Sequence, residues 1–313
     1  KTAYEIKECD WSSDVCSSDL GSQSSDGASV SERRTTLGAS EVATILGFSP
    51  WSSPFALWAR IHGLTEADTS TSTTRGQILE PAIRDWYARS IGAQIIAGPE
   101  YGATPWTRQD RPWQAARPDG YWWAGGEPPM RLLEIKTTRD WSDWTDGVPA
   151  YYAVQVLWQQ WVAAGSLWGA PTETHLVAFA TMSDEIRTFV LPYDEQAQQR
   201  AERLSELVSA WWERHIEGGE PVEADAHAAT REAIRQMYAR PTREFLPPTP
   251  ERTALVEDYR RAVAARKALE PACELARNRL LVEIGNAAGI DGLCTLSAGK
   301  ARRLTLKGEP TDG

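Results

Sequence analysis

The stretch from Arg117 to Lys136 reads RPDGYWWAGGEPPMRLLEIK, and it predicts the centre of a β-sheet. Two runs here, Gly120–Trp123 and Arg131–Thr137, are rich in aromatic or aliphatic residues and are bounded by Gly or Pro, which is typical of strands. The Gly125-Gly126 pair between them favours a hairpin turn. We therefore expect two neighbouring antiparallel strands.

Three charged residues of this stretch can meet on one face of the sheet. Glu134 and Lys136 are two residues apart on a strand, so their side chains point to the same face. Asp119 precedes the first strand, and the hairpin can bring it to that face. An isolated Glu-x-Lys is most often a solvated charge pair, but Leu133 and Ile135 beside these charges indicate a half-buried strand.

Two carboxylates and one ammonium suit the metal-assisted hydrolysis of a phosphodiester. Asp119 and Glu134 offer the hard oxygen ligands that Mg²⁺ prefers, Mn²⁺ can substitute for it, and the backbone carbonyl of Ile135 can add a further oxygen. Lys136 would position the attacking water and stabilise its hydroxide form, while the metal polarises the phosphate.

The segments around this stretch predict an α/β (α+β) fold. Helical spacing of apolar residues predicts helices over Ser40–Leu46, Ser53–His62, Thr74–Ile91, Pro149–Ala164 and Glu195–Ile216. Further strands are expected over Gln94–Ala97, Gln114–Pro118, Thr174–Ala180 and Ile186–Val190, and a loop over Thr65–Thr74. Ser40 is the expected N-cap of the first helix, and Pro81 either kinks the third helix or starts a fresh first turn. This order predicts a central mixed sheet flanked by helices.

The sequence divides into five segments. We interpret residues 1–20 as a sequencing-adapter artefact and not native sequence, because DWSSDVCSSDL (Asp10–Leu20) can be back-translated into a common adapter; a natural Ser/Asp-rich leader is the alternative. Residues 21–32 predict a disordered leader, 33–240 the catalytic domain, 241–250 a Pro-rich linker, and 251–313 an accessory region of helices and a β-hairpin. Pro271 interrupts the heptad-like spacing of this last region, which predicts two helices or one kinked helix.

Composition excludes a membrane protein and leaves nucleic-acid binding open. No apolar run reaches the roughly 18–20 residues of a membrane span, and we expect an intracellular, cytoplasmic protein. The net charge of -10 argues only weakly against a DNA partner, since a local basic track is enough for the phosphates.

A second acidic motif lies upstream, where Arg75–Pro81 reads RGQILEP and is followed by Arg84. Taken alone, Glu80 and Arg84 form an ordinary i,i+4 pair on a helix surface, and Arg75 is a solvated cation. A Glu beside a helix irregularity made by proline can instead point inward at a metal.

Five segments, in order, resemble the YqaJ-like viral recombinase family, which includes the lambda-type exonucleases of the PD-(D/E)XK superfamily. They are Leu37–Ala43 with Gly47–Pro50, Arg75–Pro81, Arg117–Gly120, Leu133–Thr138 and Tyr151–Gln155. The resemblance extends over about Arg33 to His215 and implies a restriction-endonuclease-like PD-(D/E)XK core.

The resemblance also implies roles for the matching residues. Asp119 and Glu134 resemble the family's metal ligands, Lys136 its catalytic lysine, Glu80 a further acidic residue beside the metals, and Gln155 the glutamine that completes the site. For the terminal 5′ phosphate and the DNA, the corresponding residues are Ser40, Arg33 or Arg34, and Arg75. A helix N-terminus at Ser40 would also attract an anion.

The implied activity is hydrolysis of linear duplex DNA from its 5′ end, which leaves a 3′ single strand for annealing. The implied partners are double-stranded DNA ends and a single-strand annealing protein, with the enzyme as a homotrimer in the cytoplasm of a host that carries a phage or prophage. A RecB-like nuclease with another end or strand preference is one alternative. A non-catalytic scaffold that binds DNA ends is another, which the retention of all four catalytic-type residues disfavours.

Four tryptophans lie close in sequence to the expected site: Trp141, Trp144, Trp158 and Trp161. They could stack on unpaired bases. Packing in the aromatic core is the interpretation that we favour.

Overall fold

The computed structural model describes residues 35–66, 71–99, 104–126, 129–240, 242–297 and 303–307, with side chains omitted for 71–73. Arg33 and Arg34 and the leader predicted before them lie outside the described residues. The chain forms two compact units, of which the first ends at Arg240 and the second begins at Pro241. Each is described by itself.

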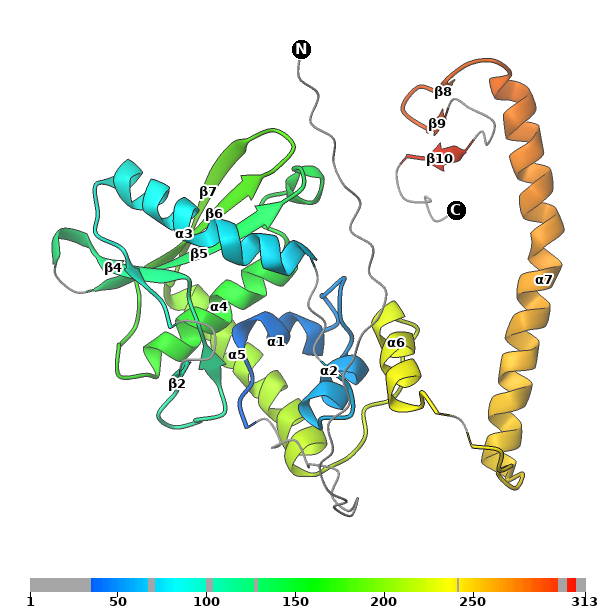
Figure 1. Cartoon of the computed structure of the whole chain (residues 1–313), viewed down its shortest axis with the longest axis horizontal. Coiled ribbons are helices and arrows are strands. Elements are labelled where there is room, and N and C mark those ends of the chain that lie inside the picture. The colour runs from blue at the N-terminus through cyan, green and yellow to red at the C-terminus, as the bar shows by residue number, and fades with distance from the viewer. Residues whose placement is uncertain are drawn as a thin grey trace, which may run out of the picture. The chain divides into compact units, whose positions relative to one another are not determined.

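A five-stranded mixed sheet organises the first unit, with the strand order β1-β4-β5-β6-β7 (Figure 1). Its strands are β1 (Ile96–Ala97), β4 (Gly120–Trp123), β5 (Met130–Thr138), β6 (Glu173–Ala180) and β7 (Glu185–Pro192). Strands β5 and β6 are parallel, and the other neighbouring pairs are antiparallel. The short strands β2 (Trp106–Thr107) and β3 (Ala115–Ala116) pair separately. The expected hairpin is present, since β4 and β5 are antiparallel and Gly125 adopts a positive φ of 68° in the turn between them.

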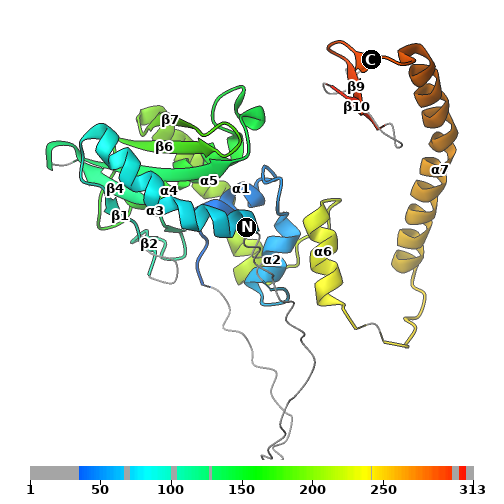
Figure 2. The ribbon, with the colours of Figure 1, turned by 45° about the horizontal axis from the view of Figure 1, so that its top comes forward.

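Helices cover both faces of this sheet because β5 is apolar on both sides (Figures 1 and 2). Leu133 and Ile135 pack with Ile83 of helix α3 (Thr71–Ile91) on one face. Leu132 and Met130 lie in the cluster that contains helix α4 (Ala150–Ala164) on the other face. Helices α1 (Ala39–Ile45), α2 (Pro54–Ile61) and α5 (Glu195–Trp212) also contribute to this second, larger cluster. The predicted α/β class with a central mixed sheet flanked by helices is therefore confirmed.

The predicted N-cap of the first helix is wrong. The helix begins at Ala39 with Gly38 as its cap, and the Gly38 N–H donates to Glu41 Oε2 at 2.9 Å. Ser40 is thus an exposed residue inside the first turn. A Gly followed three residues later by Glu competes for the cap, and the glutamate closes the turn from inside the helix.

At three further places the observed helices differ from those expected. Residues Thr71–Thr74 belong to α3, where we expected a loop, and Pro81 lies within that one helix. Helix α5 gives way to a π-helical turn over Glu213–Glu217. Helix α6 (Ala228–Met237) was not expected. A buried hydrogen bond of 2.6 Å between Thr230 Oγ1 and Ser53 Oγ connects α6 to the start of α2. This contact joins residues far apart in the chain, so no local sequence pattern predicts it.

The second unit consists of one long helix and a small antiparallel sheet. Helix α7 runs without interruption over Pro250–Ile284, so Pro271 lies inside one helix and does not separate two. The sheet has the order β10-β9-β8, with β8 (Gly289–Ile290), β9 (Cys294–Leu296) and β10 (Leu304–Leu306). Ile284 packs against Cys294 and Leu296 in its core. In the described ranges, no helix is both long and apolar enough to cross a membrane.

Candidate active site

The start of β4 holds Asp119 directly beside β5. Gly120 is paired with Leu133, so the antiparallel register places Asp119 opposite Glu134. The Asp119 N–H donates to Leu133 O at 3.0 Å, and the Ile135 N–H donates to Asp119 Oδ2 at 2.6 Å. The backbone of β5 thus fixes this carboxylate, and the hairpin brings it to Glu134 as the sequence predicts.

The carboxylate of Glu134 is almost fully buried, at 2% exposure, and both of its oxygens accept hydrogen bonds. Gln155 Nε2 donates to Oε1 at 2.6 Å, and Gln159 Nε2 donates to Oε2 at 2.7 Å. Lys136 Nζ lies 2.5 Å from Oε1. A buried charge is costly unless it is paired and hydrogen-bonded, and this one is both. Helix α4 therefore orients Glu134 through two glutamines one helical turn apart.

Lys136 lies between the two carboxylates and an aromatic ring. Its ammonium is 5.0 Å from the ring centroid of Tyr152. Burial by itself would lower the pKa of Lys136, but the Glu134 and Asp119 carboxylates raise it above its ordinary value. Lys136 is therefore held as a cation beside the carboxylates, suited to stabilising negative charge.

Helix α3 contributes Glu80 and Arg84 to the edge of this group. Arg84 Nη1 donates to Glu80 Oε1 at 3.2 Å and to the backbone oxygen of Asp119 at 3.0 Å. Burial raises the pKa of Glu80, Arg84 opposes this shift, and Glu134 adds to it. Glu80 is thus close enough to Glu134 for electrostatic coupling, and its partner Arg84 also anchors the loop that carries Asp119.

The carboxylates repel one another, as expected for groups that share a cation. Burial raises the pKa of Asp119 well above its usual range; Glu134 and Glu80 raise it further, against the opposing effects of Lys136 and the Ile135 N–H. Protonation of one carboxyl or a shared cation would relieve this repulsion.

The donor set fits a magnesium ion of the kind that keeps several non-protein ligands. Within the described ranges, no three His, Cys, Asp or Glu side chains form a ready-made metal-binding group. Mg²⁺ commonly uses one or two carboxylates together with water and substrate phosphates. Asp119 and Glu134, with the backbone carbonyl of Ile135, match that smaller requirement.

Two comparisons place this domain among known proteins. Residues 30–166 match the YqaJ-like viral recombinase domain family. The chain is 24% identical over 221 residues to Uncharacterized protein YqaJ of Bacillus subtilis (strain 168), an alignment that covers 66% of this chain. The chain spans 62% of the length of that relative.

Solved structures of two exonucleases are similar to the chain. The alkaline exonuclease LHK-Exo from Laribacter hongkongensis is 18% identical, with a TM-score of 0.42, over 60% of this chain and 93% of that one. A phage-related exonuclease from Haemophilus somnus 129PT is 12% identical, with a TM-score of 0.42, over 59% and 96% of the two chains.

The residues expected to bind the 5′ phosphate, Ser40 and Arg75, form no hydrogen bond or ion pair with Asp119 or Glu134 in the described part of the chain. Ser40 is exposed in the first turn of α1, and Arg75 is exposed near the start of α3. Their assignment to the 5′ phosphate remains a prediction.

Sequence reasoning missed Gln159 and gave Arg84 too small a role. Gln159 stands four residues after Gln155, and this spacing on a helix is the signal that could have predicted a second amide beside Glu134. The bond from Arg84 to the Asp119 backbone depends on how α3 crosses the sheet, so no local pattern reveals it.

The tryptophan prediction is confirmed for the two rings that are deeply buried. Trp144 is 3% exposed and Trp158 is 0% exposed. Trp158 Nε1 donates to Ala115 O at 3.2 Å, and Trp161 Nε1 to Gln114 Oε1 at 2.8 Å. These rings serve the core around the site.

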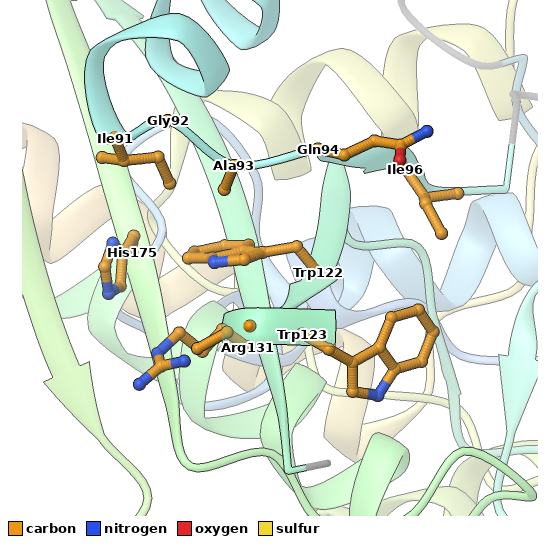
Figure 3. A pocket seen from close by; sticks show the side chains of 11 residues that line it. Ile91, Gly92, Ala93, Gln94, Ile96, Trp122, Trp123, Arg131 and His175 are labelled. Atoms are coloured by element: carbon orange, nitrogen blue, oxygen red, sulfur yellow. The ribbon is translucent and has the colours of Figure 1, made fainter. Parts of the chain in front are cut away.

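A separate pocket of about 610 Å³ lies at the end of α3 (Figure 3). Trp122, Arg131 and His175 line it, and it shares no lining residue with the carboxylate group. Glu173 Oε1 lies 2.6 Å from Arg131 Nε and 3.1 Å from His175 Nε2. The candidate catalytic residues predicted from the sequence therefore do not line this pocket.

Proposed function

We propose that this chain is a metal-dependent DNA exonuclease that hydrolyses phosphodiester bonds from the 5′ end of linear duplex DNA and leaves a 3′ single strand. The observation that carries the proposal is the convergence of Asp119, Glu134 and Lys136 on one buried face of the β4–β5 hairpin. The match of residues 30–166 to the YqaJ-like viral recombinase domain family supports DNA as the substrate.

Each residue has a separate task in this proposal. Asp119, Glu134 and the Ile135 carbonyl would hold Mg²⁺, which when bound polarises the phosphate and makes its water a stronger nucleophile. Gln155 and Gln159 keep the Glu134 oxygens in a fixed direction, as outer partners of metal ligands do. The ammonium of Lys136 orients the attacking water and stabilises the negative charge that develops during attack. Glu80 adds negative charge at the edge of the site.

The 5′ preference rests on Ser40 with Arg33 or Arg34, and on Arg75. Cations and a serine in the first turn of a helix are groups that bind a terminal phosphate. This part of the proposal is drawn from the family resemblance and needs its own arm in the experiment.

The test compares three DNA substrates with Mg²⁺ and with EDTA. They are 5′-phosphorylated linear duplex, the same duplex without the phosphate, and covalently closed circles. We expect Mg²⁺-dependent loss of the linear substrates alone, faster with the phosphate, and end-labelling should show release from the 5′ end. The Glu134→Gln variant serves as the control for contaminating nucleases.

Each alternative predicts a different result. Cleavage of closed circles would indicate an endonuclease, and release from the 3′ end would indicate a RecB-like nuclease with another polarity. Binding of linear ends without any cleavage would favour the non-catalytic scaffold. Activity that persists in EDTA would refute the metal-dependent mechanism.

A further inference from the structure

An exposed tryptophan contacts two neighbouring tyrosines, one of which lies against Lys136. Trp51 is 63% exposed, although a ring of this size usually buries most of its area. Its ring centroid is 4.8 Å from that of Tyr151 in an edge-to-face arrangement and 6.1 Å from that of Tyr152. Tyr152 in turn carries Lys136 Nζ 5.0 Å from its ring centroid. Two ring contacts thus connect an open aromatic surface to the candidate catalytic ammonium.

The loop that carries Trp51 is held in place by its own hydrogen bonds. Ser49 Oγ accepts from the Trp51 N–H at 3.3 Å and from the Ser52 N–H at 3.2 Å. The Phe48 N–H donates to Ala43 O at 2.9 Å, which fixes the loop to the end of α1. Trp51 is therefore presented on a defined loop next to the first turn of α4.

A nucleobase is the ligand that this surface fits. An exposed flat ring, separated by one tyrosine ring from the candidate catalytic ammonium, offers the two features by which proteins bind single strands, namely stacking on the base and charge for the backbone. The edge-to-face contact with Tyr151 keeps the Trp51 ring in a fixed orientation, so the ring loses little conformational entropy when a base stacks on it.

We propose that Trp51 is a base-stacking residue that binds an unpaired nucleotide next to the phosphate to be cleaved. This inference rests on the proposed function, because it takes DNA as the substrate of the Asp119–Glu134–Lys136 site. It adds a binding subsite, with the single-stranded segment of a DNA end as its ligand.

The experiment measures stacking without hydrolysis. A short single-stranded oligonucleotide with 2-aminopurine at its 5′ end is titrated with the full chain in EDTA, and both the affinity and the quenching of 2-aminopurine are recorded. Trp51→Ala should weaken binding by roughly 5- to 100-fold and abolish the quenching. Trp51→Phe should restore part of both, because a smaller ring still stacks.

Phe48→Ala is the matched control. Phe48 lies in the same loop and is 52% exposed. Its loss should leave affinity and quenching within about two-fold of wild type. Thermal unfolding of all three variants checks the fold. In Mg²⁺, Trp51→Ala should raise KM for DNA ends far more than it lowers kcat.

The outcomes separate this inference from the proposed function. Unchanged affinity and quenching in Trp51→Ala would overturn the inference, as would an equal loss in Phe48→Ala, while DNA cleavage by the wild type would still stand. A wild type that never cleaves DNA but quenches 2-aminopurine through Trp51 would support the inference and refute the proposed function. A wild type that binds no oligonucleotide would overturn the stacking site.

Discussion

Around Leu133–Lys136, the two faces of strand β5 have opposite chemistry although their residues alternate along one short segment. On the α3 face, Leu133 and Ile135 are buried among aliphatic and aromatic neighbours. Toward α4, Glu134 is equally buried but is surrounded by two glutamines and a lysine. Over these four residues, the α3 face provides stability and the α4 face provides chemistry, and burial alone does not distinguish them.

The largest effect should come from the apolar face. Leu133→Ala removes a fully buried side chain from the cluster with Ile83 and Val177, and we expect a loss of about 2–5 kcal/mol in unfolding free energy. Urea unfolding followed by circular dichroism measures it. Val190→Ala, at an exposed position of β7, is the control and should change stability by no more than about 0.5 kcal/mol. Similar losses in both variants would contradict the assignment of this face to stability.

On the polar face, substitution of Lys136 should lower activity more than stability. Lys136→Ala removes the ammonium beside Glu134, and the rate of DNA hydrolysis should fall by roughly 10²- to 10³-fold. The fold should persist with reduced stability, because Gln155 and Gln159 still donate to the Glu134 carboxylate while its paired charge is lost. Single-turnover cleavage and thermal unfolding measure the two quantities. Lys267→Ala, an exposed lysine of α7, should retain full activity, and wild-type activity in Lys136→Ala would exclude the proposed mechanism.

Two neighbouring glutamines of α4 should differ in their effects, one on activity and the other on stability. Gln159 and Gln160 are each 1% exposed, but Gln159 donates to Glu134 while Gln160 donates to Leu191 O at 2.9 Å. Gln159→Leu should lower activity by roughly 10-fold through loss of a group that orients Glu134. Gln160→Leu should cost about 1–3 kcal/mol of stability with kcat unchanged. Equal activities would mean that Gln159 does not orient the carboxylate.

The smallest effect concerns the pH dependence of stability at Asp119. Its pKa is raised in the folded protein, so ionisation of this carboxyl opposes folding: the stability it contributes is complete below the usual aspartate pKa and is lost as the pH rises through the raised one. Asp119→Asn keeps a hydrogen-bond acceptor for Ile135 but does not ionise. Without metal, the variant should therefore gain stability relative to wild type as the pH rises toward neutral.

Urea unfolding in EDTA at a series of pH values tests this, with Asp146→Asn at an exposed carboxyl as the control. A constant difference between Asp119→Asn and wild type at every pH would show that Asp119 has no raised pKa. Activity of Asp119→Asn in Mg²⁺, measured in parallel, should be lost.

Sequence reasoning succeeded where the relevant geometry is local. The side-chain period of a strand and the turn at Gly125 were enough to place Asp119, Glu134 and Lys136 together. It failed at the first helix, where Glu41 supplies the cap interaction in place of Ser40. At Pro271 it left two alternatives open, and α7, which continues through that residue, excludes the two separate helices.

The mixed α/β architecture, the hairpin and the shared face of the three charged residues could all be predicted from the sequence, because hydrophobic alternation and turn residues act over a few positions. The groups that surround those charges could not, because they come from distant segments. Gln159 reaches Glu134, Arg84 reaches the Asp119 backbone, and Trp51 meets Tyr151 through contacts between elements far apart in the chain. Their positions follow from how α3, α4 and the loop before α2 pack on the sheet, since side-chain packing between distant segments is not encoded in any local period.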